Sequence, residues 1–323
     1  MAWKPPFVSD FASCTESSEE PVLLLPAAFR DSSSHAQRCP SDDIFGFLAQ
    51  DLSVERLDKI HDWLWITGRP LPPRPLTFQT AVAREIVLDE RADMHLVWER
   101  SRKMHFKPLP HYLLSRDFWG HHICRNTEIY RNALGLLYSY IALIQHESDF
   151  KIAKSNGLIP DSLSWHKWTL LTQQTLTSLP SGTLTCPANL NLTPRYHFGE
   201  LRLSRLNLIY RLRGYYVRGY ERQYQTYGEL FTAYIAPLSV TTVYFVLALT
   251  AMQVGLATGY LERSEAFQAV SWGFAVVSII APLVLVLLLM VVSLVVFAVN
   301  SWRALSSERE RLRAIAVRSE SGS

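Results

Sequence analysis

Residues 282–299 read PLVLVLLLMVVSLVVFAV, and this stretch decides the fold. It lies in a segment that has no Asp, Glu, Lys or Arg between Glu265 and Arg303. A second segment without these residues lies between Glu229 and Glu262. Each segment is longer than the roughly 20 apolar residues that a helix needs to cross a bilayer. The two segments therefore indicate two membrane-spanning helices.

These helices are predicted to form a transmembrane hairpin over 231–302, with crossings at about 233–256 and 272–300. Inside hydrocarbon, a helix satisfies the backbone hydrogen bonds within the segment itself. Arginines flank the hairpin on both sides, whereas the connecting loop has one Arg and two Glu. Because basic residues near helix ends tend to stay in the cytosol, we expect a multi-pass protein with both termini cytosolic. The basic tail over 303–323 would then be cytosolic as well.

Small residues recur at every fourth position near the end of the first crossing, at Ala251, Gly255 and Gly259. Such spacing allows two membrane helices to approach closely. The same glycines could instead loosen the helix end before the turn, and the sequence leaves both readings open. The two crossings contain no ionisable side chain for a proton relay or an ion site.

The part before the hairpin is predicted to be an α+β cytosolic domain over 41–197, mainly helical, after a disordered segment over 1–40 that is rich in Ser, Pro and acidic residues. Three short β-prone runs predict a small antiparallel sheet. They span 84–88, 94–98 and 103–107. Apolar periodicity predicts the helices of this domain. These lie at 41–65, 126–153 and about 162–178.

Residues 198–230 are predicted to form a basic amphipathic helix next to the membrane. Its candidate membrane-surface residues are Arg202, Arg205, Arg211 and Arg213. Such a helix can lie on anionic lipid headgroups. It can equally be an ordinary helix that packs on the domain core. The lipid bilayer is the one partner that the sequence itself indicates; protein partners or a homo-oligomer remain open.

Histidines gather in one part of the chain and are the weak candidates for a metal site: His95, His105, His121 and His122. The spacings H-x-x-x-H and C-x-x-C, which are typical of zinc sites, do not occur there. We therefore predict no metal and no cofactor. No phosphate-binding loop, dinucleotide motif or nucleophile elbow is present, which favours a non-enzymatic protein. The arginines do not form a nucleic-acid-binding pattern, so we expect no nucleic-acid partner.

Several segments together resemble an uncharacterised family of fungal integral membrane proteins, the domain of unknown function DUF6601. They are Arg84-Glu-Ile-Val, Met94-His-Leu-Val-Trp, Lys107-Pro-Leu-Pro, His146-Glu-Ser-Asp-Phe150, Gly199-Glu-Leu-Arg-Leu-Ser-Arg-Leu-Asn207 and Ala251-Met-Gln-Val-Gly-Leu-Ala-Thr258. The resemblance covers roughly residues 45–300. It implies a fungal source and a two-helix membrane protein, and it supplies no reaction. Some such proteins accompany gene clusters of secondary metabolism.

Three functions are compatible with these patterns. The first is an accessory or scaffold protein held on a membrane, favoured by the hairpin and by the missing catalytic motifs. The second is an oligomeric cation transporter of the CorA topology, although its Gly-Met-Asn triplet is replaced by residues 251–255, which read AMQVG. The third is a membrane-bound enzyme that acts on a lipophilic metabolite. The first is our expectation.

Overall fold

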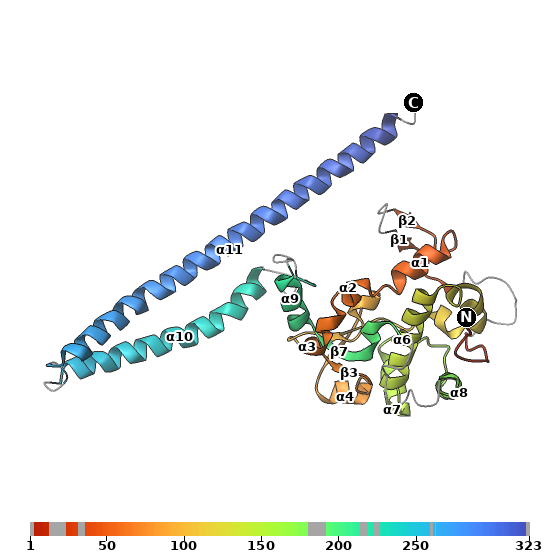
Figure 1. Ribbon diagram of the computed structural model, residues 1–323, viewed down its shortest axis with the longest axis horizontal. Helices are drawn as coiled ribbons and strands as arrows, with labels where there is room; N and C mark the ends of the chain where they lie inside the picture. Colours follow the sequence, from red (N-terminus) through yellow and green to blue (C-terminus); the bar gives the residue numbers. More distant parts are fainter. Residues whose placement is uncertain are drawn as a thin grey trace. The chain divides into compact units, whose positions relative to one another are not determined.

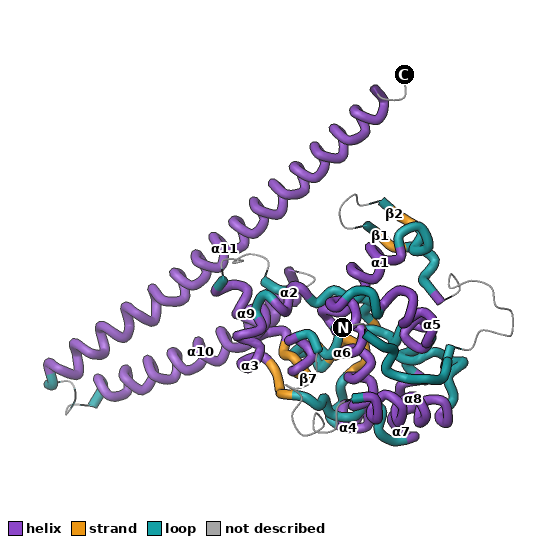
Figure 2. The backbone as a smooth tube through the Cα atoms, turned by 45° about the vertical axis from the view of Figure 1, so that its right-hand side comes forward, coloured by secondary structure: helices purple, strands orange, loops and turns teal. Residues whose placement is uncertain are grey.

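The structure is a computed structural model that divides into two units, residues 1–223 and 224–323. It describes residues 3–12, 24–31, 36–179, 192–213, 219–221, 227–258, 261 and 263–320. Helices and loops make up most of the first unit, and its strands are short (Figure 2). Each unit is described by itself below.

A five-stranded mixed sheet in the first unit brings together distant parts of the chain. Its order is β3-β7-β5-β6-β4. The strands are β3 (Gly68–Pro70), β4 (Glu85–Leu88), β5 (Val97–Trp98), β6 (Lys103–Phe106) and β7 (Phe198–Arg202). Pairs β4–β6 and β5–β7 are parallel, while β5–β6 and β3–β7 are antiparallel. The predicted antiparallel arrangement is therefore correct only for β5 and β6.

The difference arises because β4 pairs with β6 rather than with β5, its neighbour in the chain. Between β4 and β5 the chain makes the short helix η3 (Ala92–Met94), which lets β4 run beside the far edge of β6 in the same direction. Strand β7 then lies against the other edge of β5. A parallel pair of this kind needs a crossover connection instead of a tight turn.

Helices surround this sheet in the first unit (Figure 1). They are α1 (Ile44–Asp51), α2 (Glu55–Asp58), α3 (Leu64–Thr67), α4 (Leu76–Ala81), α5 (Arg116–Phe118), α6 (Thr127–Leu143), α7 (Glu147–Ser155), α8 (Trp165–Ser178) and α9 (Leu203–Leu212). Short helical turns connect them. These are η2 (His61–Trp63), η4 (His111–Leu114), the π-helical η5 (Trp119–Ile123) and η7 (Pro194–His197).

Helix α6 is the buried central helix that the apolar run predicted. It begins where Asn126 Oδ1 accepts hydrogen bonds from the backbone N–H groups of Glu128 and Ile129, at 2.8 and 3.1 Å. Most of its residues are buried, and they lie on every face of the helix. The single helix predicted over 126–153 is wrong in one respect, because the chain breaks after Leu143 and α7 begins separately.

The N-terminal residues 3–12 lie against the domain, although the sequence predicted disorder over 1–40. Phe7 and Phe11 are buried, and the ring of Trp3 stacks on Tyr130 with ring centroids 4.6 Å apart. Strands β1 (Phe29–Arg30) and β2 (Gln37–Arg38) form a separate two-stranded hairpin. The apolar side chains hold this segment, because burial offsets the entropy lost on ordering it.

The predicted helix over 198–230 is shorter than expected. Phe198–Arg202 is strand β7, and α9 spans only Leu203–Leu212. The buried face of α9 packs on a second core cluster of the domain. This cluster includes Leu57, Ile60, Leu64, Val97, Leu206 and Ile209. Residues 214–218 and 222–226 lie outside the described part.

The second unit consists of two long helices, α10 (Tyr227–Leu256) and α11 (Glu265–Glu320). They pack on each other, and the ring centroids of Phe245 and Phe274 lie 5.5 Å apart. Both are long and apolar enough to cross a membrane. Helix α11 runs on through Glu320, so the predicted tail over 303–323 continues the helix over its described residues.

Candidate functional site

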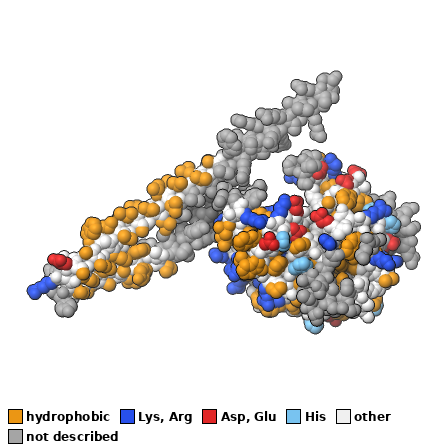
Figure 3. Space-filling model, viewed as in Figure 1, with side chains coloured by type: hydrophobic (Ala, Val, Ile, Leu, Met, Phe, Trp, Pro, Cys, Tyr) orange, Lys and Arg blue, Asp and Glu red, His pale blue; other side chains and the backbone are white. Residues whose placement is uncertain are grey.

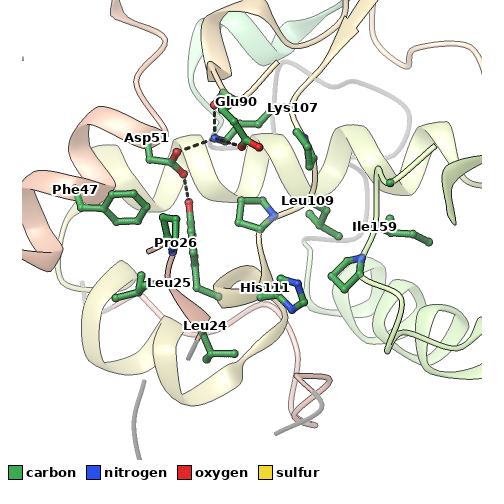
Figure 4. Close-up of a pocket in the computed structure, with 15 residues that line it drawn as sticks. Leu24, Leu25, Pro26, Phe47, Asp51, Glu90, Lys107, Leu109, His111 and Ile159 are labelled. Atoms are coloured by element: carbon green, nitrogen blue, oxygen red, sulfur yellow. Dashed lines mark hydrogen bonds and ion pairs between the residues drawn. The ribbon is translucent and has the colours of Figure 1, made fainter. Parts of the chain in front are cut away.

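A pocket of ≈ 260 Å³ in the first unit has one polar, charged end and otherwise mostly apolar walls, which include His111 (Figure 4). Asp51 and Lys107 meet at the polar end, together with Tyr112. Leu24 and Leu25 lie at the opposite end in this view. Four prolines add rigid apolar surface to the walls: Pro26, Pro108, Pro110 and Pro160. An apolar pocket with a few convergent polar groups is the usual form of a small-molecule site.

Lys107 is the most unusual side chain of this pocket, because it is a lysine that is only 1% exposed. Its Nζ donates a hydrogen bond to Asp51 Oδ1 at 2.8 Å and another to the backbone carbonyl of Glu90. Tyr112 OH donates to Asp51 Oδ2 at 2.5 Å. One carboxylate therefore joins an ammonium and a phenol, which satisfies the rule that buried charges are paired.

Three separate elements supply this group. Asp51 is the last residue of α1, Lys107 directly follows strand β6, and Tyr112 lies in η4. The backbone of Lys107 is fixed from both sides: its N–H donates to His95 Nδ1 at 3.2 Å, and its carbonyl accepts from Tyr140 OH at 2.6 Å. The backbone position of Lys107 is thus set by the buried core.

The Tyr112 phenol stays protonated at neutral pH. Burial raises its pKa well above the ordinary value, and the neighbouring Asp51 carboxylate raises it further. As a neutral hydroxyl it acts as the hydrogen-bond donor seen here. The charges of Lys107 and Asp51 cancel, and the exposed Glu90 carboxylate, whose Oε2 is 4.0 Å from Lys107 Nζ, is a further negative charge in the lining.

His95 and His105, two of the predicted metal candidates, have other partners. His95 is fully buried, and its Nε2 lies 2.8 Å from Ser139 Oγ, while its Nδ1 accepts from the Lys107 backbone. Burial lowers its pKa, as do the nearby cations Arg195 and Lys107. A neutral imidazole that bonds on both nitrogens is a structural core residue.

His105 lies between two carboxylates at the edge of the sheet. Its Nε2 is 3.0 Å from Glu99 Oε1, and its Nδ1 is 3.5 Å from Asp89 Oδ2. Burial lowers its pKa, but the two carboxylates outweigh burial and raise the pKa to about 9. The imidazole is therefore a cation at neutral pH, paired with the two carboxylates.

His121 and His122, the remaining candidates, lie together on η5, with ring centroids 6.4 Å apart. His121 Nδ1 contacts the backbone carbonyl of Asp117 at 2.8 Å. Within the described ranges, no group of three or more His, Cys, Asp or Glu side chains is arranged to hold a metal ion. The four histidines do not converge on one point of the fold.

The four candidate membrane-surface arginines divide into two kinds. Arg202 is in β7, and its guanidinium lies 4.9 Å from the centre of the Trp98 ring. Arg205, Arg211 and Arg213 are exposed at or just after α9. Arg205 also donates to the Ile66 carbonyl at 2.7 Å, and Arg213 donates to the Lys59 carbonyl. These two bonds fasten α9 to α3 and α2.

The three small residues predicted for helix packing also differ. A Cβ atom at Gly255 would lie 2.9 Å from Phe267 Cζ, so the missing side chain lets α11 approach α10 there. Ala251 is exposed. Gly259 lies outside the described residues. Of the two described positions, Gly255 is thus the one with a close contact.

A second buried charge cluster, centred on Glu200 of β7, was also not predicted. Its carboxylate accepts from Arg74 at 2.7 and 2.5 Å and from Arg84 at 2.6 Å. Gln79 donates to it at 3.0 Å. Burial raises the pKa of Glu200, but these donors outweigh burial and lower it to about 2. The cluster ties α4 and its flanking residues to the sheet.

Sequence reasoning missed the Asp51, Lys107 and Tyr112 group for a clear reason. Asp51 and Lys107 are separated by 56 residues, and no fixed spacing connects them. One weak signal was present: Lys107 is the last residue of the β-prone run over 103–107 and precedes Pro108. A charged residue at the end of a buried strand is a candidate for a buried pair.

Comparison with known proteins gives one finding. The model of a family of unknown function (DUF6601) matches residues 44–282. The match begins at the first residue of α1 and extends through α10 into α11. Neither the curated proteins nor the solved structures contain a match to this chain. Because the match covers well over half of the chain, the protein belongs to DUF6601, a family of unknown function.

Proposed function

We propose that this protein is a membrane-anchored accessory protein. Helices α10 and α11 would cross a bilayer as a hairpin, and the first unit would be a cytosolic domain that binds other molecules without catalysing a reaction. The organising role is to hold that domain at a membrane surface.

One observation supports the proposal above all others: few residues of the two candidate spans are buried within the described structure. Within the candidate spans Ser239–Leu256 and Glu265–Leu288, 0% and 6% of the residues are buried. Hydrophobic side chains cover most of the described part of the two helices in Figure 3. Soluble proteins rarely expose so large a contiguous apolar surface, whereas lipid tails would cover it.

The flanking charges support the orientation. Arginines precede α10 and follow the apolar part of α11, as expected for cytosolic flanks. Sealed microsomes whose cytosolic face is outward give the test, with a membrane-impermeant maleimide as the probe. The exposed Cys39 should react in intact microsomes. A Ser264→Cys variant should react at position 264 only after permeabilisation. Labelling at position 264 as well as at Cys39 in intact microsomes would contradict this topology.

Membrane insertion itself is tested by extraction at native expression levels. The protein should sediment with membranes and stay there in alkaline carbonate, because a spanning hairpin is released only by detergent. Release into the carbonate supernatant would refute the anchor. A variant with Leu247→Arg and Leu285→Arg should lose retention, since each arginine at the centre of a membrane helix costs about 3 kcal/mol.

The outward face of α9 is part of the same proposal. Leu208 and Leu212 are exposed there beside Arg205 and Arg211, and the exposed Trp65 is on the adjoining α3. Apolar and basic side chains lie side by side on this part of the domain in Figure 3. Aromatic and basic residues together favour the headgroup region of an anionic leaflet.

A further inference from the structure

We propose that the pocket at Asp51, Lys107 and Tyr112 binds a small neutral molecule that is mostly apolar and carries one hydroxyl or carbonyl oxygen. The site needs no contribution from the second unit, since all its lining residues lie in the first. The inference is therefore independent of membrane insertion.

We infer that the ligand carries an oxygen because one N–H donor of Lys107 lacks an acceptor among the described residues. A lysine ammonium has three N–H donors. Two of them are used, by Asp51 Oδ1 and by the Glu90 carbonyl. The Glu90 carboxylate also lies near Nζ, but its Oε2 is 4.0 Å away, beyond hydrogen-bond length. In the part of the chain that the structure describes, the third donor thus has no acceptor.

This third donor cannot turn to bulk water freely, because the side chain is 1% exposed. A buried donor without an acceptor is unfavourable, and Lys107 lines the pocket. An oxygen placed in the pocket beside Nζ would complete the set. A hydroxyl could also donate in turn to Asp51, whose carboxylate oxygens each accept one side-chain hydrogen bond.

The ligand should be neutral because neither kind of ion fits the polar end. A carboxylate would meet no free cation there, since Lys107 is paired with Asp51 and the exposed Glu90 carboxylate lies 4.0 Å from its Nζ. A protonated amine could approach Glu90, but it has no lone pair to accept from Lys107 and would be repelled by the Lys107 charge. Such ions are therefore disfavoured relative to an alcohol or a ketone.

The rest of the molecule should be apolar and compact. Leu24, Leu25, Phe47, Leu109 and Ile159 form most of the remaining wall (Figure 4). The volume of ≈ 260 Å³ lies slightly below the roughly 300–1,000 Å³ of ordinary ligand pockets. A single ring with one oxygen-bearing arm satisfies these conditions. The prolines give the wall a preformed shape, since each fixes its backbone φ angle.

The test uses two matched fluorinated probes, 4-fluorobenzyl alcohol and 4-fluorotoluene, which differ by the hydroxyl group. Fluorine NMR line broadening is measured on the full-length protein in detergent micelles, with empty micelles at equal detergent as the blank. The alcohol should give a saturable broadening above the blank, and it should bind more tightly than 4-fluorotoluene. Broadening that never exceeds the blank would overturn the proposal.

Three variants locate the probe. Leu25→Trp should fill the pocket and abolish the saturable component, whereas Leu170→Trp, at an exposed position of α8 outside the pocket, should leave it unchanged. Lys107→Met should weaken the alcohol about tenfold and leave 4-fluorotoluene unaffected, because it removes a charged donor and little volume. Equal affinity of Lys107→Met and the wild type for the alcohol would refute the role of Lys107.

A folding control keeps the result decisive. Near-ultraviolet circular dichroism of each variant is compared with that of the wild type. Should Lys107→Met lose its native spectrum, Tyr112→Phe takes its place, since it frees Asp51 Oδ2 from its phenol donor and keeps the ring. The freed oxygen should accept from the probe hydroxyl and change the alcohol affinity alone. A Tyr112→Phe variant that binds both probes as the wild type does would also overturn the proposal.

Discussion

At the scale of single residues, Glu200 shows how much one buried carboxylate can hold. Its side chain is 2% exposed, and Arg84 beside it is 10% exposed. A Glu200→Gln variant would leave both guanidinium groups without their anion, so the free energy of unfolding should fall by about 3 kcal/mol. Urea denaturation measures this loss. Glu147→Gln is the matched control, since its ion pair with Lys151 is largely exposed and should matter by under about 0.5 kcal/mol.

His105 gives a pH dependence of opposite sign to that of a buried carboxylate. Its pKa is raised from 6.5 to about 9, so the folded state binds the proton more tightly than the unfolded state. The stabilisation is fully present below about pH 6.5 and is lost as the pH rises through 9. The wild type should therefore exceed His105→Gln in stability by roughly 3 kcal/mol at pH 6, and the gap should close by pH 10.

Urea melts at both pH values give this measurement. The charged groups around His105 are Asp89, Glu99, Lys103 and, through Asp89, Arg91. A Lys103→Gln background, which removes the one lysine among these groups, serves as the control. A stability gap that stays constant from pH 6 to pH 10 would show that the Asp89 and Glu99 carboxylates do not hold the proton.

Sequence patterns could nominate residues but not their partners. The histidines were singled out because His is a metal ligand, yet His95 bonds to Ser139 and His105 to Glu99. The hydrogen-bond partner of a side chain depends on which elements become neighbours in the fold. That is decided by contacts between residues far apart in the chain. Lys107 became important only because α1 brings Asp51 to it across the fold.

At the scale of elements, local signals worked where the cause was local. The apolar run of α6 predicted its burial, because a helix that is apolar on every face lies in a core or a membrane and this run is too short to cross a membrane. The break after Leu143 was missed. It depends on Asp149, whose Oδ2 accepts from the backbone N–H groups of Gln145 and His146 at 3.2 and 3.0 Å. Asp149 also accepts from Thr77 of α4, a partner that no local pattern reveals.

The turn between α10 and α11 offers a test of helix packing. Gly255 faces Phe267 so closely that a β-branched residue would push the helices apart, whereas Gly273 has nothing within 4 Å of an added Cβ. Gly255→Ile should lengthen the distance between spin labels on the two helices. Gly273→Ile should leave it unchanged. Equal distances in both variants would favour the other reading of the small residues, a loosened helix end.

At the scale of the whole molecule, the sequence predicted the two long helices because absence of charge over a long segment is visible without any knowledge of contacts. It could not predict the order of the strands in the sheet. Strand β7 comes after all the other strands in the chain, yet it lies between β3 and β5. That insertion joins parts of the first unit that are far apart in the chain and sets the position of α9, which follows β7 directly.

The position of α9 leads to a prediction about the bilayer. If the outward face of α9 and α3 lies on lipid, brominated phosphatidylcholine should quench the exposed Trp63 and Trp65 in reconstituted vesicles. A Trp272→Phe and Trp302→Phe background removes the tryptophans of the second unit. Quenching should then be stronger with phosphatidylserine present, because each arginine near an anionic surface contributes about 1 kcal/mol.

Variants separate this lipid contact from its alternatives. Changing Arg205, Arg211 and Arg213 to Gln should abolish the dependence on phosphatidylserine, and Trp63→Phe with Trp65→Phe should remove most of the quenching. Trp165→Phe, on α8, should change little. If neither the arginine variants nor the two tryptophan variants change the quenching, this surface faces water or another protein. In that case α9 would serve only the domain core, through its buried residues Leu206 and Ile209.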